Sequence, residues 1–585
     1  MKRSTYIWSL LVGCVAFATS CDLTENVQVK ADKSMIFGSK SGLELYSNSF
    51  YKALPTLKNG FMQDKMCDVG AVSNTDTFIK QGAYNTETAT SWSWGALKNV
   101  NYFIDGCNDP KYCTVEAETR DNYLGIARWF RAWFYYDKLT TYGEVPWFPN
   151  DIQSYQNDVM YKDRDSRDVI IRNLIADLDF AYEHIQATSS TGSATLTRWA
   201  AAALKSRVCL FEAAYRRYHN LTGLEITPEE LYREAAKAAK LVIDNSGCSL
   251  NTAAGKKGAY RDLFYSETPL TQEVILAVCA NEKSGIFGEQ NWWFNARSYG
   301  LCWSLVRSFV HTYLKQDGTP FTAAADYAVK SFAEEMEGRD LRLEQTVRGR
   351  NFLWDGKTAV ADIKNLSLTG YQVIKYTLDE SKYDGGAKNI NSIPLIRYAE
   401  VLLNYAEAQA ELGVITDSEW ALTVGALRKR AGITGGTETL PTTVDSYLQR
   451  TFYPDVTSPV LLEIRRERAI ELVAEGMRFD DLRRWKCGSL METLPWSGIH
   501  IPGLEQPVDV NGDGVNDYYF TEGEVASAPA AYKNIAVRVN QDGVGLYAEA
   551  NPVSGYDLVY KTGAGDRYWY PDGRQYLYPI PAKVI

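Results

Sequence analysis

Helical periodicity in two blocks of the chain constrains the fold most strongly. Apolar residues recur at every third or fourth position in several segments within 94–245 and 394–485. The segments are 94–105, 116–142, 165–185, 197–218, 228–245, 394–412, 418–431 and 460–485. This spacing places the apolar side chains on one face of an α-helix, and that face must pack against a neighbouring element. The sequence therefore predicts a mainly α-helical fold.

Small residues indicate how two of these helices pack. Alanine is frequent in both 197–218 and 228–245, most densely at 200–203 and 235–239. Small side chains let two helices approach closely, as in tetratricopeptide hairpins, although no strict repeat of that length is present. We therefore predict a tetratricopeptide-like scaffold of helical hairpins.

The remaining sequence is irregular. Glycine, asparagine, aspartate and aromatic residues are scattered through 246–393 without long periodicity, and the C-terminal end is rich in glycine, proline and tyrosine. Loops of this kind often present ligand-binding side chains. We therefore predict a helical part over 41–245, an irregular insertion with ligand loops over 246–393, and a C-terminal part over 394–585 with a loop-rich end.

The start of the chain is predicted to be an export signal with its attachment point. Lys2 and Arg3 precede an apolar stretch over 6–18 that is too short to span a bilayer, and small residues precede Cys21. The pattern resembles a bacterial lipoprotein signal, in which the cysteine becomes the lipidated first residue. An ordinary signal peptide with an incidental cysteine is the alternative. We expect 1–20 to be removed, and 21–40 to form a lipid anchor and polar tether.

Composition and motifs argue against several classes of function. The formal net charge is −10 and no basic block is present, so no nucleic-acid partner is expected. The four histidines are isolated, and the motifs of zinc proteases, serine hydrolases, P-loop NTPases and dinucleotide-binding enzymes are absent. We therefore predict that the protein is not an enzyme. A catalytic pair of carboxylates is the alternative that the sequence leaves open, because the chain contains many Asp and Glu residues.

The cysteines predict no metal centre. None has the spacing of zinc ligands, either with another cysteine or with a histidine. Cys107 and Cys113 lie close together in a loop-like stretch, where they could close a small disulfide in an exported protein.

Five motifs, in matching order and spacing, carry a resemblance to a known family. They lie at 127–136 with 142–146, 232–244, 396–408, 461–485 and 576–581. Residues 461–485 read Leu-Leu-Glu-Ile-Arg-Arg-Glu-Arg-Ala-Ile-Glu-Leu-Val-Ala-Glu-Gly-Met-Arg-Phe-Asp-Asp-Leu-Arg-Arg-Trp. This segment resembles the signature of the SusD/RagB family, whose members are lipoproteins of the bacterial outer membrane.

The resemblance implies a SusD-like fold and a surface-exposed lipoprotein of the cell outer membrane. SusD-like proteins bind oligosaccharides and deliver them to a SusC-like TonB-dependent transporter without catalysis. RagB-like members do the same for oligopeptides, and a purely structural surface lipoprotein is a third hypothesis. Accordingly, we expect Cys21 to be lipidated and to hold the protein on the outer membrane, facing outward.

Charged residues in the signature are predicted to be structural. Glu463 and Arg466, and likewise Glu475 and Arg478, have the i, i+3 spacing of ion pairs on one helix face. Arginine and glutamate placed in this way usually tie a helix to its neighbours through bidentate contacts. A chemical role is the less favoured alternative.

Two regions of the sequence are predicted to supply a binding platform for a sugar. A pyranose packs its C–H face on an aromatic ring, while its hydroxyl groups need polar partners. The predicted rings are Trp92, Trp292, Trp293 and Tyr299, with Asn291, Asn295 and Arg297 as hydrogen-bonding candidates. Aromatic clusters usually pack inside a protein, so the alternative is that half or more of these rings belong to the core.

A polar segment near the C-terminus resembles a calcium loop. Its alternating oxygen donors are Asp509, Asn511, Asp513, the Val515 carbonyl and Asp517, with Gly514 at the sixth position. The twelfth position is Phe520, so Glu522 or Glu524 would have to complete the site. A polar turn without metal is the equal alternative. Apart from this possible structural calcium, no cofactor is expected.

Overall fold

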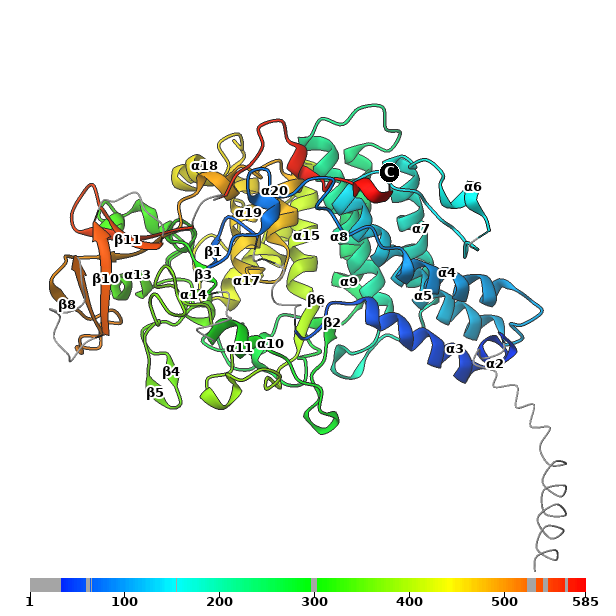
Figure 1. The fold of residues 1–585 in the computed structure, drawn as a ribbon, viewed down its shortest axis with the longest axis horizontal. Coiled ribbons are helices and arrows are strands. Elements are labelled where there is room, and N and C mark those ends of the chain that lie inside the picture. Colours follow the sequence, from blue (N-terminus) through cyan, green and yellow to red (C-terminus); the bar gives the residue numbers. More distant parts are fainter. Residues whose placement is uncertain are drawn as a thin grey trace, which may run out of the picture.

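The computed structural model describes residues 33–58, 64, 66–153, 155–295, 302–522, 533–539, 545–562 and 567–584. Within them, the long helices gather on one side of the molecule, and the insertion and a β-sheet lie on the other (Figure 1). The predicted mainly α-helical class is confirmed. No helix among these residues combines the length and the apolar character that crossing a membrane requires.

Successive helices of the N-terminal part pack on one another as hairpins. They are α4 (Gly95–Asn108), α5 (Ala117–Tyr142), α7 (Arg167–His184), α8 (Arg198–Tyr218) and α9 (Pro228–Asn245). The C-terminal helix α15 (Tyr398–Glu411) packs on α9 and α8, and α19 (Pro459–Glu471) packs on α15. The scaffold thus joins the two periodic blocks of the sequence into one helical layer (Figure 1).

Helix α9 shows why the sequence folds in this way locally. The Thr227 side chain accepts a hydrogen bond from the Glu230 N–H (3.2 Å), while the Glu230 carboxylate accepts one from the Thr227 N–H (2.7 Å). This capping box satisfies two N–H groups at the helix start, and Pro228 is pre-shaped for the first turn. The alanines of α9 that face α8, including Ala235 and Ala239, are fully buried.

Three predicted boundaries were wrong. Strand β6 (Ile393–Arg397) replaces the first residues of the predicted 394–412 helix, because it pairs antiparallel with β2 (Val274–Val278). The 418–431 helix is split at Thr423 into α16 (Asp417–Leu422) and α17 (Val424–Arg430). In the predicted tether, α2 (Lys33–Phe37) is followed by α3 (Lys40–Ser47), and Phe37 is fully buried.

The signature segment is also two helices instead of one. Helix α19 ends at Glu471, and α20 (Arg478–Arg484) begins after a bend. Within the bend, Ala474 has φ 65° and Gly476 has φ 82°. Glycine reaches this left-handed backbone region at little cost, so the Gly476 position allows the chain to turn.

A six-stranded sheet lies in the C-terminal region, which we predicted to be rich in loops. Its order is β7 (Ser497–Ile501), β12 (Tyr556–Lys561), β11 (Gly545–Ala550), β10 (Lys533–Val539), β9 (Tyr518–Glu522) and β8 (Gln506–Val508). Buried residues of the sheet and the insertion, such as Phe520 and Tyr371, form a second hydrophobic cluster beside that of the helices. The insertion is therefore packed on the sheet and has a core of its own.

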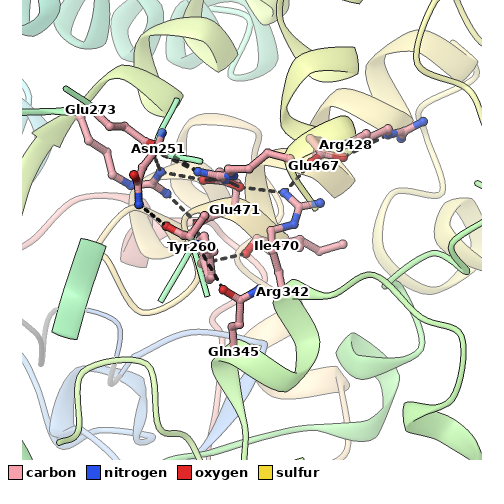
Figure 2. A network of polar contacts seen from close by, with 12 residues as sticks. Asn251, Tyr260, Glu273, Arg342, Gln345, Arg428, Glu467, Ile470 and Glu471 are labelled. Carbon is pink, nitrogen blue, oxygen red and sulfur yellow. Dashed lines mark hydrogen bonds and ion pairs between the residues drawn. The ribbon is translucent and has the colours of Figure 1, made fainter. Parts of the chain in front are cut away.

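A buried network of charges ties the insertion to the helical scaffold (Figure 2). Glu471 of α19 pairs with Arg342 of α14 (Arg342–Thr346) at 2.7 Å, Arg397 at 2.6 Å and Arg430 at 2.5 Å. Burial alone would raise the pKa of Glu471, but the three guanidinium groups hold it well below its usual range. Arg397 and Arg430 also pair with Glu273, so the network joins α14, β6, α17 and α19 with the residue that precedes β2.

One of the two predicted charge pairs is present. Arg466 pairs with Glu463 at 3.0 Å, as expected within α19. The second prediction was wrong, because the helix ends before Glu475 and the i, i+3 geometry is lost. Glu475 instead pairs with Lys375 (2.7 Å), and Arg478 pairs with Asp68 (2.7 Å).

The disulfide that the sequence left open is not formed. Cys107 and Cys113 are both free thiols, as are the other cysteines of the described residues. Cys107 is buried at the end of α4, and this burial raises its thiol pKa, which keeps it protonated.

Candidate ligand-binding site

Helix α11 (Gln290–Asn295) carries four of the predicted ligand-binding residues. It lies at the lower edge of the insertion in Figure 1, between the helical scaffold and the hairpin of β4 (Leu353–Trp354) and β5 (Lys357–Thr358). Arg297 and Tyr299 follow this helix but lie outside the described residues, as does Cys21.

Asn291 is a structural residue, so its predicted role in ligand binding was wrong. Its side chain is fully buried. The Asn291 Nδ2 group donates to the Leu378 carbonyl (2.8 Å), and Oδ1 accepts from the Leu378 N–H (2.8 Å) and from Asn389 Nδ2 (2.7 Å). These bonds fasten α11 to the loop around 378–389, so no donor or acceptor is left for a ligand.

The three predicted tryptophans in the described residues are all half-buried. The rings of Trp292 and Trp293 meet edge to face at 4.9 Å, and Trp293 Nε1 donates to Glu289 at 3.3 Å. Trp92 packs on Tyr142 at 4.9 Å and belongs with the helical cluster, whereas Trp293 packs against the cluster of the insertion and sheet. The rings thus divide between two cores.

A cavity of about 500 Å³ opens beside the C-terminal end of α11. We call it the α11 cavity. Its polar and aromatic lining consists of Asn295, Arg348, Trp354, Thr358, Asp362, Asp384 and Asp517, with Ala359, Val360 and Leu366 completing it. The lining comes from α11, the β4–β5 hairpin, the loop after that hairpin, and the residue before β9. Of the predicted residues, the structure brings Asn295 and Asp517 into this cavity.

Arg348 and Trp354 form the most distinctive part of the cavity. Trp354 is half-buried on β4, and the Arg348 guanidinium lies 5.2 Å from the centre of its ring. Arg348 is only 6% exposed, and burial lowers its pKa to about 10. Nη1 donates to the Val360 carbonyl (3.2 Å), but Nε has no hydrogen-bond partner among the described residues. The guanidinium is part of the cavity lining, so its positive charge lies beside a bound ligand.

Three carboxylates, those of Asp362, Asp384 and Asp517, share the cavity lining with this arginine. Asp384 accepts from Asn295 Nδ2 (3.1 Å) and Asn291 Nδ2 (3.2 Å), and burial raises its pKa. Asp362 accepts from Asn365 Nδ2 at 3.0 Å, and Asp517 accepts from the Val510 N–H at 2.9 Å. The cavity therefore offers carboxylate acceptors, one guanidinium and one aromatic face.

A second, larger cavity of about 790 Å³ lies between α4, α5 and residues 475–480. We call it the α4–α5 groove. Phe50, Trp133, Phe134 and Met477 give it apolar walls. Three of its charged side chains have ion-pair partners: Arg207 pairs with Glu400, Glu475 with Lys375, and Asp480 with Arg483. Lys52 and Asp137 line the groove as well. Because its walls are largely apolar and most of its charges are paired, this groove suits a polar ligand less well than the α11 cavity.

The predicted calcium loop closes on its own backbone. Asp509 accepts from the Gly512 N–H (2.7 Å) and the Gly514 N–H (2.8 Å), and Asp513 accepts from the Val515 N–H (2.8 Å). Within the described part of the chain, no three His, Cys, Asp or Glu side chains come together as a metal ion would require. The carboxylates would have to rearrange to hold calcium, and calcium binding stays a prediction.

Most of the lining residues were missed from the sequence, among them Arg348, Trp354 and Asp384. A signal for Trp354 was present, because Asp355 and Gly356 follow it and this dipeptide is typical of a tight hairpin. Both turn residues have positive φ, 50° and 73°, as such a turn requires. A hairpin of this kind is a rigid element that can hold a tryptophan beside its tip. The irregular composition of the insertion concealed this hairpin.

Comparisons with known proteins agree with this architecture. A sequence profile of the SusD family matches residues 272–585, which is more than half of the chain. No curated protein sequence matches.

Solved structures match over nearly the whole length. A SusD-like carbohydrate-binding protein from Bacteroides fragilis is 18% identical, with a TM-score of 0.67, over 94% of this chain and 98% of its own. A second SusD-like protein from B. fragilis is 21% identical, with a TM-score of 0.63, over 95% and 96%. A SusD superfamily protein from Parabacteroides distasonis is 18% identical, with a TM-score of 0.54, over 93% and 96%. At these identities the structures establish the fold, and with the profile match they show that this chain belongs to the SusD family.

Proposed function

We propose that the protein binds oligosaccharides in the α11 cavity and delivers them to a SusC-like TonB-dependent transporter. The observation that carries the proposal is the Arg348 guanidinium beside the Trp354 ring in the lining of one cavity. A pyranose needs an aromatic face for its C–H groups and polar groups for its hydroxyls. Asn295 and Asp384 supply such polar groups in the same lining. No chemistry is required of these residues, in keeping with a binding protein.

The proposed setting is the outer face of the outer membrane, with Cys21 as the lipidated residue. The lipoprotein-like signal and membership of the SusD family support this setting. Replacing Cys21 by alanine is expected to release the protein from the membrane fraction. Full membrane retention of the Cys21→Ala protein would contradict the proposal.

Peptide binding is the second candidate function, and the α4–α5 groove favours it. Trp133 lies in this groove and stacks on Trp129 at 5.4 Å with an interplanar angle of 12°. Apolar walls of this size suit amino-acid side chains better than a hydroxylated sugar. A RagB-like protein would use such a groove for an oligopeptide.

A glycan array and a peptide library, both probed with the mature chain from residue 22 onward, distinguish the two functions. We expect glycan binding that is lost in Trp354→Ala and kept in Tyr161→Ala, an exposed aromatic residue that does not line the cavity. Peptide binding that is lost in Trp133→Ala, with an empty glycan array, would favour the second function. A protein that binds neither class would leave the structural-lipoprotein hypothesis.

A further inference from the structure

We infer that Cys107 and Cys113 are a redox-active pair of thiols, which closes to an intramolecular disulfide in an oxidising environment. The closed bond fastens the end of α4 at the place where α2, the first described helix, packs on it. This modification site lies outside both cavities, so the inference does not depend on the ligand.

The chain folds back directly after α4, and this turn brings the two thiols together. The Asp109 N–H donates to the Gly106 carbonyl (3.4 Å), and the Cys113 N–H donates to the Asp109 carbonyl (2.9 Å). The Cys107 thiol lies within hydrogen-bonding reach of the Cys113 sulfur, and both side chains pack in the hydrophobic cluster of the helices. A disulfide requires two cysteines whose side chains face each other, and this pair meets that condition.

The other cysteines of the described residues are not arranged in this way. For each of them, the main influences on the thiol pKa are burial and groups other than cysteine. Oxidation to an intramolecular disulfide is therefore expected at one place within the described part of the chain.

The two thiols differ in how readily they react. Burial raises the pKa of both, but a hydrogen bond from the Val115 N–H partly offsets this effect at Cys113. Cys107 is only 2% exposed, whereas Cys113 is half-buried, so an oxidant reaches Cys113 more easily. Because the thiolate is the form that attacks a disulfide, Cys113 is the thiol that starts the exchange.

The reaction needs an oxidant, and the export proposed above brings the chain into contact with one: a disulfide, carried by a protein or a small molecule. The Cys113 thiolate attacks one sulfur of that disulfide, and the other sulfur leaves as a thiolate. Cys107 then loses its proton and attacks the Cys113 sulfur, which releases the second thiolate. The pair gives up two electrons and two protons, and the oxidant becomes two thiols.

The pair lies where α2 meets the helical scaffold (Figure 1). The Phe37 ring of α2 lies so close to Gly106 that a Cβ there would come within 2.0 Å of it. Lys33 of α2 lies 5.4 Å from the ring centres of both Tyr102 of α4 and Tyr112 of the turn. Because Tyr112 directly precedes the second cysteine, a disulfide would hold both parts of this α2 contact together.

The test maps the bond by peptide analysis. The mature chain from residue 22 onward would be treated in its folded state with oxidised glutathione, blocked with N-ethylmaleimide in denaturant, and cut with trypsin. Cleavage after Lys111 separates the two cysteines, so a disulfide would hold peptides 99–111 and 112–120 together. We expect this linked pair of peptides, and two fewer blocked thiols than in the reduced protein.

Variants and melting temperatures test whether the bond fastens α4. Oxidation should raise the melting temperature of the unmodified protein by about 2 °C, because a disulfide across a short loop stabilises modestly. The rise should vanish in Cys113→Ser. Cys248→Ser is the matched control and should keep both the linked peptides and the rise, because Cys248 is also half-buried but has no cysteine among its main neighbours. If Cys113→Ser does not fold, the unmodified protein, compared in its oxidised and reduced forms, still decides.

The outcomes distinguish this inference from the proposed function. Separate peptides, with both cysteines blocked or each bound to glutathione, would overturn the inference and leave glycan binding untouched. Linked peptides without a rise in melting temperature would confirm the disulfide and overturn its stabilising role.

Discussion

Two buried polar regions of the molecule differ in how their arginines are paired. In the network around Glu471, each guanidinium makes an ion pair of 2.5–2.7 Å with that carboxylate. In the α11 cavity, Arg348 is nearly as buried but makes no ion pair with a described residue. The first arrangement joins elements that are far apart in the sequence. The second leaves binding capacity unused, as expected where a ligand completes the set.

Charge balance sharpens this contrast. Removing one partner from a closed network leaves the other charges buried and uncompensated, so the fold is affected. Removing a cavity residue exposes little that the fold depends on, so binding is affected instead. The two regions should therefore respond to mutation with opposite readouts.

The largest expected effect is on stability, in the network. Glu471→Gln removes the charge that three guanidinium groups share, and we expect it to lower the free energy of unfolding by about 3–5 kcal/mol. Urea unfolding followed by circular dichroism measures this loss. Glu225→Gln, which breaks an exposed pair with Arg172, is the control and should change stability by less than ~1 kcal/mol. Equal effects of the two variants would contradict the contrast between buried and exposed charges.

Trp354→Ala tests the other side of the comparison. Loss of the stacking face should weaken glycan binding by about 1–3 kcal/mol, a magnitude measured for bases stacked on aromatic rings. The melting temperature should stay nearly unchanged, because the ring lines a cavity on a two-residue strand. Calorimetric titration and thermal melting of the same sample give both quantities. A variant that loses stability, while its folded fraction binds glycan as tightly as before, would assign Trp354 to the core.

The two tryptophans of α11, beside the cavity, should differ in what their replacement affects, stability for one and glycan affinity for the other. Trp293 packs against the hydrophobic cluster of the insertion, so Trp293→Ala should cost about 1–2 kcal/mol of stability. Trp292→Ala, at the adjacent half-buried position, should act mainly on glycan affinity if the predicted platform extends over α11. Loss of stability in both variants, with unchanged affinity, would place the platform elsewhere.

The sequence predicted the scaffold far better than the cavity, for physical reasons. Helix α9 was predicted within its observed bounds because its cap, Thr227 with Glu230, and its buried alanines are all local signals. Strand β6 was missed because its partner, β2, lies more than one hundred residues away, and its apolar residues also fit a helical spacing. The bend before α20 depends on Gly476, a single residue within an otherwise helical pattern.

The cavity residues were harder to find because they are contributed by distant loops. Asn295 was predicted from its aromatic neighbours, but Arg348, Asp362 and Asp384 have no shared motif in the sequence. Asn291 was assigned to the ligand because asparagine is a common sugar partner, yet packing of α11 on the 378–389 loop buries it. Tertiary contacts, which no local pattern reports, decide such cases.

A smaller effect is expected from acid, again in the scaffold. His219 stacks on Tyr215 at 4.0 Å, and its Nε2 lies 2.8 Å from the Arg483 carbonyl, to which it donates when neutral. Burial lowers the pKa of His219 to about 4, against an ordinary value of 6.5. As the pH falls, the unfolded chain therefore binds a proton at His219 before the folded chain does. The stability that the neutral His219 contributes is complete above pH 6.5 and is lost as the pH falls through about 4.

His219→Gln isolates that contribution. Glutamine keeps a donor for the Arg483 carbonyl but does not titrate. Between pH 6.5 and 4, the variant should therefore lose less stability than the unmodified protein, by up to about 2 kcal/mol. Urea unfolding at a series of pH values measures the difference between the variant and the unmodified protein. Glycan binding should not change, because His219 does not line the α11 cavity. Parallel pH profiles of the two proteins would contradict the assignment.

The smallest expected effect concerns the calcium loop, which adjoins the cavity through Asp517. If calcium binds, the carboxylates of Asp509, Asp513 and Asp517 must turn toward one ion, and the ion stabilises the folded state by mass action. At ten times the dissociation constant this amounts to about 1.4 kcal/mol, a rise of a few degrees in melting temperature at most. We would compare melting in calcium, in magnesium and with a chelator, using Asp513→Asn as the control that weakens the ligand set. A rise in melting temperature that is specific to calcium and lost in Asp513→Asn would show that a metal ion supports this part of the cavity lining. Identical melting temperatures in all three conditions would show instead that backbone N–H groups alone hold the turn closed.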